Sequence, residues 1–163
     1  MNNIKFASII EKMTIEEKIA QLMQLATPFF KGAADQGQIT GPMQNMGISE
    51  IDIKNTGSVL GASGAAEVIN IQKKHLEENR LGIPLLVMSD IVHGYKTIFP
   101  VPLAIGCSWD LELAEQSAEI AAREAAVSGV HVTFAPMVDL VRDPRWGRVM
   151  ESTGEDPYLN SLF

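Results

Sequence analysis

Residues 57–90 read GSVLGASGAAEVINIQKKHLEENRLGIPLLVMSD, and this stretch decides the fold. A short apolar run at 57–61 and a second one at 84–90 enclose residues 64–80, which read as a helix closed by a glycine and a proline. A strand, a helix and a second strand form the unit from which parallel sheets are built. The stretch therefore predicts an α/β fold.

The same pattern continues along the chain. Asp110 can cap a long helix that ends at Gly129, and a third apolar run, VHVTFAP, follows at 130–136. The runs are mostly apolar rather than alternating, as expected of strands that are covered on both faces. The sequence predicts about three βα units, joined by right-handed crossovers.

Two short helices are expected before the first of these strands. Thr14 followed by Glu17 is a capping box, and the apolar residues after it are three or four apart, which predicts one helix face. The members of that face are Ile15, Ile19, Leu22 and Ala26. Residues 27–56 carry little pattern and predict a loop with a short helix near 48–54.

Composition limits the classes of protein. The chain has 163 residues and a net charge of −7, which suits one ordinary domain and disfavours nucleic acid and anionic membranes as partners. Cys107 is the only cysteine, so an intrachain disulfide is excluded. The first twenty residues do not resemble a signal peptide, and we expect a cytoplasmic protein.

Two long connections follow predicted strands. The second strand ends at Asp90 and is followed by 19 residues, 91–109; the third is followed by DLVRDPRWGRVMESTGEDPY at 139–158. Connections of this length are usually functional or disordered, and their aromatic and basic residues disfavour disorder. Both follow the carboxyl ends of strands, where parallel sheets bind ligands, so we expect a binding rim there.

Asp90 and His93 allow several interpretations. Asp90 can accept hydrogen bonds from a polar ligand, or it can hold its own loop through backbone N–H groups. A metal pair with His93 lacks further ligands at useful spacing, and we expect no metal and no cofactor. His93 is expected to be structural, His75 to face solvent, and Trp109 to pack.

The charged stretch predicts a salt-bridge network. Arginine bonds carboxylates through two nitrogens, and one arginine left over could bind a ligand. The ring of Trp146 could stack on a sugar or fill the small core of the loop. The charged residues are Arg142, Arg145 and Arg148 with Asp143, Glu151, Glu155 and Asp156.

Three segments together resemble a known family. The segments are GIPLLVMSDIVHGYKTIFPVPLAIGCSWD, FAPMVDLVRDPRWGRVMESTGEDPYL and, near the start, TIEEKIAQLMQ. Together they are similar to the N-terminal barrel domain of family 3 glycoside hydrolases. The resemblance covers almost the whole chain and is weakest at 27–56. It implies a (β/α)₈ barrel followed by a second domain, and retaining hydrolysis by two carboxylates.

The resemblance also implies roles for individual residues. Asp90 and Arg148 match substrate-binding positions that contact the terminal sugar. The nucleophile and the acid/base are expected outside this chain, so no catalytic residue is assigned here. The other motif positions are expected to be scaffold near the site: His93, Arg142, Asp143, Glu151, Glu155 and Asp156.

The resulting expectation is an N-terminal fragment of an exo-acting retaining β-glucosidase. Residues 1–56 would supply N-terminal helices and a loop, and 57–163 the first βα units of an incomplete barrel. The fragment alone is expected to be inactive. Its expected partners are a β-glucoside or β-linked gluco-oligosaccharide, the rest of the barrel and the second domain, and further copies of itself.

Two alternatives stay open. The fragment could be a non-catalytic sugar-binding or assembly module, or the chain could be a different barrel hydrolase whose acid is Glu151 or Glu155.

Overall fold

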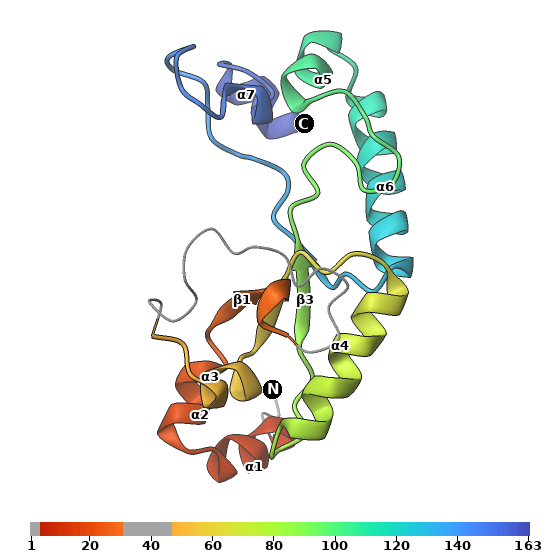
Figure 1. Ribbon diagram of the computed structural model, residues 1–163. Helices are drawn as coiled ribbons and strands as arrows, with labels where there is room; N and C mark the ends of the chain where they lie inside the picture. Colours follow the sequence, from red (N-terminus) through yellow and green to blue (C-terminus); the bar gives the residue numbers. More distant parts are fainter. Residues whose placement is uncertain (1–3, 31–46) are drawn as a thin grey trace. The chain divides into compact units, whose positions relative to one another are not determined.

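The computed structural model describes residues 4–30 and 47–163, which divide into two compact units. The first unit comprises Met1–Met88 with Ser128–Val132, and the second comprises Ser89–Val127 with Thr133–Phe163. Figure 1 shows the elements along the chain. In order they are α1 (Ile4–Lys12), α2 (Ile15–Ala20), β1 (Gln24–Ala26), η1 (Thr27–Phe29), α3 (Glu50–Asn55), β2 (Ser58–Leu60), α4 (Ala65–Glu78), β3 (Leu86–Ser89), α5 (Pro102–Ser108), α6 (Leu111–Val127), β4 (Val132–Thr133), η3 (Val149–Glu151) and α7 (Pro157–Leu162).

The sheet has four strands in the order β1-β2-β3-β4. β1 pairs with β2 and β2 with β3, both parallel, and Val59 lies opposite Leu25 on one side and Val87 on the other. Each strand thus lies beside its predecessor in the chain. Barrels of βα units have this order, whereas doubly wound sheets reverse direction partway. The α/β prediction is confirmed, with one strand more than the three expected.

The additional strand, β1, corrects the prediction for the N-terminal region. The capping box is present, since Glu17 N–H donates to Thr14 Oγ1 (3.2 Å) and Thr14 N–H to Glu17 Oε2 (2.9 Å). The helix, however, ends at Ala20, and the expected apolar face does not form, because Leu22 is 89 % exposed. Pairing with β2 draws the following residues into the sheet and buries Leu25. A nonlocal contact therefore overrides the local spacing.

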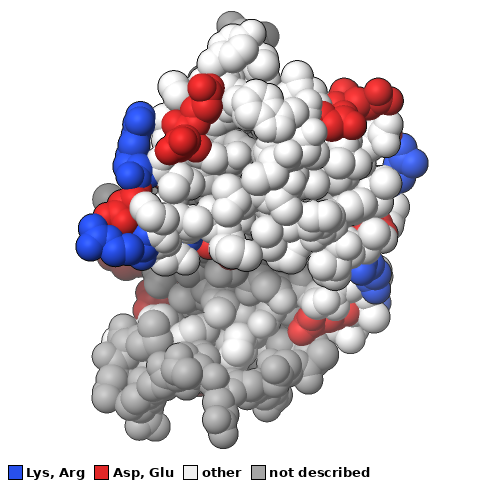
Figure 2. Space-filling model, turned by 90° about the horizontal axis from the view of Figure 1, so that it is seen from above, with Lys and Arg blue, Asp and Glu red and all other residues white. Residues whose placement is uncertain are grey.

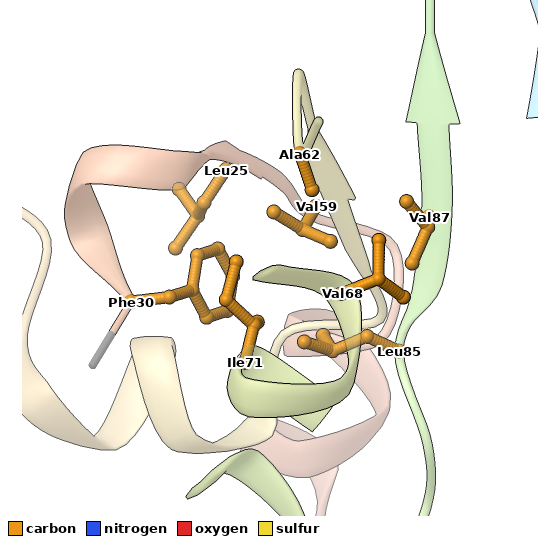
Figure 3. Close-up of a cluster of buried hydrophobic side chains, with 8 residues drawn as sticks. All are labelled: Leu25, Phe30, Val59, Ala62, Val68, Ile71, Leu85 and Val87. Atoms are coloured by element: carbon orange, nitrogen blue, oxygen red, sulfur yellow. The ribbon is translucent and has the colours of Figure 1, made fainter. Parts of the chain in front are cut away.

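The core of the first unit lies between the sheet and α4. Val68 and Ile71 of α4 pack against Val59, Leu85 and Val87 (Figure 3). Leu25, Phe30 and Ala62 complete this cluster of buried side chains.

Helix α2 and the segment after α4 are joined by an ion pair that the sequence did not reveal. Arg80 donates from Nε to Glu17 Oε1 (2.8 Å) and from Nη2 to Glu17 Oε2 (2.7 Å). These hydrogen bonds, followed by the one from Thr14 N–H, lower the pKa of Glu17 to about 2. The carboxylate therefore stays ionised across the physiological range.

The second unit contains a helix, α5, inside the connection that was expected to be loop. Pro102 occupies its first turn, where a missing N–H costs nothing. Asp110 caps α6 as predicted, because Leu113 N–H donates to its Oδ1 (3.0 Å). One expectation was wrong, since Trp109 is 76 % exposed rather than packed. The Cys107 side chain is exposed as well.

Charge on the surface is mixed. On the face drawn in Figure 2, acidic and basic side chains lie around the margin of the described residues, and the middle of that face is uncharged. In the part of the chain that the structure describes, no helix has the length and apolar character needed to cross a membrane.

Candidate functional site

Asp90 comes directly after β3, and its side chain is exposed. The chain then forms a closed turn. Phe99 N–H donates to the His93 carbonyl (2.8 Å), His93 Nδ1 lies 3.0 Å from the Phe99 carbonyl, and Gly94 and Ile98 form an antiparallel bridge. His93 thus closes the turn. Among the hydrogen bonds of the described residues, none ties Asp90 to its own loop, so its carboxylate remains available to a ligand.

Glycine is required within this turn. Gly94 has φ +114°, and a Cβ there would lie 2.0 Å from the Thr97 carbonyl oxygen. A larger residue would therefore force the turn that follows Asp90 to open.

Glu124 of α6 holds the turn from outside. Its Oε2 accepts from the N–H groups of Lys96 and Thr97 (2.8 Å each), and its Oε1 accepts from Thr97 Oγ1 (2.6 Å). The Thr97 hydroxyl is the main reason that the pKa of Glu124 is lowered; the two backbone donors add to the effect. Sequence reasoning missed this residue, since nothing in its spacing links it to a turn so far away in the chain.

The charged stretch after β4 is fixed largely by neutral groups. Ser152 is fully buried, and its Oγ donates to the Asp139 carbonyl (2.7 Å). Val141 N–H donates to the Gly154 carbonyl (3.1 Å). Helix α5 packs against η3, and a Cβ on Gly106 would lie 2.0 Å from the Thr153 carbonyl oxygen. The role of Ser152 could not be predicted from the sequence, because a single serine among charged residues gives no signal.

The arginines form two local pairs rather than the expected network. Arg145 binds Asp143 through Nε and Nη2, the closest approach being 2.5 Å. Arg148 binds Glu151 in the same manner, with distances of 2.6 to 3.1 Å. Each arginine lowers the pKa of its partner carboxyl.

The remaining charged positions of the motif take no part in these pairs. Asp156 caps α7, since Leu159 N–H donates to its Oδ1 (2.8 Å). No ion pair involves Arg142 or Glu155 within residues 4–30 and 47–163, and both side chains are exposed. The Trp146 backbone contributes to the turn before η3, accepting from Val149 N–H (3.2 Å).

Asp90 and Arg148, the two predicted substrate-binding residues, lie in the same unit and interact electrostatically. The hydrogen bond to Glu151 is the main reason that the pKa of Arg148 is raised, and the charges of Asp139 and Asp90 add to it. In the described part of the chain Asp90 and Arg148 form no direct ion pair.

No metal site is evident among the described residues, where no three His, Cys, Asp or Glu side chains cluster suitably.

Comparison with known proteins identifies the family. The family profile described as the glycosyl hydrolase family 3 N terminal domain matches residues 14–163. A crystal structure of a β-glucosidase from Listeria innocua is 55 % identical and superimposes with a TM-score of 0.91 over 99 % of this chain. A mutant of the same enzyme has been crystallised with laminaribiose, and the enzyme itself with glucose. The chain therefore belongs to glycosyl hydrolase family 3, and the similarity lies in the N-terminal domain of that family.

Two relatives have the names of glycosidases. A periplasmic β-glucosidase of Salmonella typhimurium is 34 % identical over 95 % of this chain, and a β-xylosidase of Formosa agariphila is 39 % identical over 50 % of it. The chain spans only about a fifth of the length of the Salmonella and Listeria enzymes.

Proposed function

We propose that the chain supplies part of the sugar-binding subsite of an exo-acting, retaining β-glucosidase that hydrolyses terminal non-reducing β-D-glucosyl residues. The observation that supports this proposal is that Asp90 and Arg148 belong to one compact unit and that the charge of Asp90 contributes to the raised pKa of Arg148. The complexes of the similar Listeria enzyme with glucose and laminaribiose support a glucoside as the ligand.

The chemistry of the two side chains suits a sugar. A sugar hydroxyl both donates and accepts, so a carboxylate and a guanidinium together can bind two hydroxyls of one ring. Glu151 occupies Nε and Nη2 of Arg148 and leaves Nη1 outside those hydrogen bonds. Glu151 thereby restrains the guanidinium plane. When the terminal sugar is held in a fixed orientation, its binding energy can lower the free energy of the transition state.

The two catalytic carboxylates are assigned to parts of the enzyme beyond these residues. A retaining glycosidase needs a nucleophile and an acid/base about 5 Å apart. Glu151 is a poor candidate for the acid, because Arg148 lowers its pKa, whereas a general acid needs a raised one. We propose that the remaining barrel and a second domain provide both groups, and that this chain alone has no turnover.

Calorimetry with glucose tests the subsite. Arg148→Ala should abolish binding, whereas Arg145→Ala is the matched control, since Arg145 lies in the same stretch and is likewise paired with one carboxylate. Asp90→Ala should also abolish binding. Equal losses in the two arginine variants, or no binding by the unchanged chain, would refute the proposed subsite.

An assay with an aryl β-glucoside tests the proposed inactivity. Turnover that survives purification and disappears in Asp90→Ala would contradict it. If glucose binds and Arg148→Ala abolishes the binding while no parent enzyme can be reconstituted, the non-catalytic sugar-binding or assembly module becomes the better description.

A second substrate class has specific support. One relative is a β-xylosidase, and xylose differs from glucose by lacking the hydroxymethyl group. Competition between the two sugars in the same calorimetric experiment decides between them. We also propose a cytoplasmic location.

A further inference from the structure

The three histidines of the chain lie in different settings. His75 is on the core face of α4 with only 5 % of its surface exposed, which contradicts the expectation that it faces solvent. His93 closes the turn after Asp90. The third, His131, is the one whose ring bonds to the backbone of a neighbouring strand.

His131 lies directly before β4 and bonds to β3 twice. Its backbone N–H donates to the Val87 carbonyl (2.8 Å), and its side-chain Nδ1 accepts from the Val87 N–H (2.9 Å). Val87 alternates with Leu86 and Met88, whose backbone groups bond to the segment that contains β2. A single residue, His131, therefore satisfies both backbone groups that Val87 directs towards β4.

The imidazole replaces a main-chain acceptor. In a regular parallel pair, a residue whose carbonyl accepts from residue 131 donates its own N–H to the carbonyl of residue 129. Gly129 instead has φ +90° and lies in the turn after α6, and the Val87 N–H donates to the His131 ring. The side chain thus extends the pairing of a strand, β4, that is only two residues long.

This hydrogen bond defines the protonation of the ring. A backbone N–H can only donate, so Nδ1 of His131 must offer a lone pair, and the proton of the neutral imidazole is on Nε2. A proton on Nδ1 would oppose two donors.

The donor that depends on this lone pair belongs to the core. Val87 is 2 % exposed and packs in the same cluster as Val59, Val68 and Leu85. A buried N–H that loses its acceptor is costly. The pairing at Val87 therefore needs an acceptor atom in the side chain of residue 131.

The bonded strand segment leads directly to the sugar site. Asp90 follows Val87 by three residues, and between them the Ser89 carbonyl accepts from Phe134 N–H at the longer distance of 3.3 Å. We propose that His131 is a positioning residue for sugar binding, in which the Nδ1 lone pair holds the segment of β3 that ends at Asp90. This role depends on the glucose-binding function proposed for Asp90.

Nuclear magnetic resonance of the whole chain at neutral pH tests the hydrogen bond. The ¹⁵N resonances of the His131 ring should show a proton on Nε2 and none on Nδ1. A proton on Nδ1 would overturn the proposal.

Two substitutions of similar shape separate the acceptor from the bulk of the side chain. Asn places its Oδ1 as many bonds from the backbone as Nδ1 of His, whereas Leu has a methyl group there. His131→Leu should speed hydrogen exchange of the Val87 amide by at least about 5-fold, as expected when a buried donor loses its partner. His131→Asn should exchange more slowly than His131→Leu, and equal rates in the two variants would overturn the proposal.

Calorimetry with glucose tests the connection to the sugar site. His131→Leu should bind glucose at least about 2-fold more weakly than the unchanged chain, the lower limit for one hydrogen bond, and His131→Asn should restore the affinity. Ile71→Val is the control for a general loss of stability, because it trims the same core and leaves the His131 bond intact. Its affinity for glucose should be unchanged, and a loss equal to that of His131→Leu would overturn the proposal.

The remaining outcomes separate this role from the sugar site itself. Absence of glucose binding by the unchanged chain would refute the sugar site and the positioning role together. Full affinity in His131→Leu would refute the role of His131 alone. If His131→Leu does not fold, the position of the ring proton and the glucose affinity of His131→Asn decide.

Discussion

Two neighbouring leucines test whether β3 presents Asp90 as described. Leu85 is 2 % exposed and belongs to the core, whereas Leu86, at the start of β3, is 49 % exposed. Replacing either leucine by Ala removes the same three carbon groups. For a fully buried side chain, the transfer free energy lost with these groups is about 2.4 kcal/mol. For Leu85 a cavity term adds to this, so Leu85→Ala should lower the free energy of unfolding by about 3 kcal/mol. Leu86→Ala should cost about 1 kcal/mol, since half of that side chain already contacts water.

Urea unfolding of the two variants, followed by circular dichroism, measures this difference. With an m-value of about 1–3 kcal/mol per molar urea, the difference of about 2 kcal/mol should separate the two midpoints by roughly 0.7 to 2 M. Equal midpoints, or the larger loss in Leu86→Ala, would mean that the strand is shifted by one residue, because such a slip exchanges the two faces. Asp90 would then project from the other face of the sheet, and the proposed sugar site would fail with it.

Three further outcomes follow from the contacts. Gly106→Ala should destabilise the chain by about 1–3 kcal/mol in the same urea assay, because its Cβ would meet a carbonyl oxygen at 2.0 Å; Gly147→Ala, which meets nothing within 4 Å, should not. Glu124→Gln should speed hydrogen exchange of the two amides that its carboxylate accepts from, while Glu119→Gln on the same helix should leave them unchanged. Burial keeps the pKa of His75 below 6.5 in the folded chain. The stability that the neutral, buried ring contributes is therefore complete above pH 6.5 and is lost as the pH falls. This loss of stability should be absent in His75→Phe.

Local chemistry in the sequence predicted part of the fold. The capping box at Thr14 and the cap at Asp110 were both correct, because a cap depends on residues within three positions. β1 was missed because its three residues become a strand only by pairing with Ser58–Leu60. No spacing within Gln24–Ala26 contains that information.

The buried histidine was a different kind of error. Val68, Ile71 and His75 are three and four residues apart on α4, and they are its buried residues. The spacing that was used for other helices would have placed His75 on the core face. It was overlooked because histidine was treated as polar, although the neutral ring tolerates burial when one nitrogen is bonded.

Different kinds of interaction position the two residues of the candidate site, Asp90 and Arg148. Asp90 follows β3 directly, and Phe134 N–H donates to the carbonyl of Ser89 (3.3 Å), so sheet pairing defines where Asp90 lies. Arg148 comes well after β4, in a stretch with little regular structure. Its position depends on Glu151, on the buried hydroxyl of Ser152 and on the close approach of α5 to η3. Motif matching could name both residues, but only the contacts explain why an irregular, charged stretch can hold a guanidinium group within electrostatic reach of a strand end.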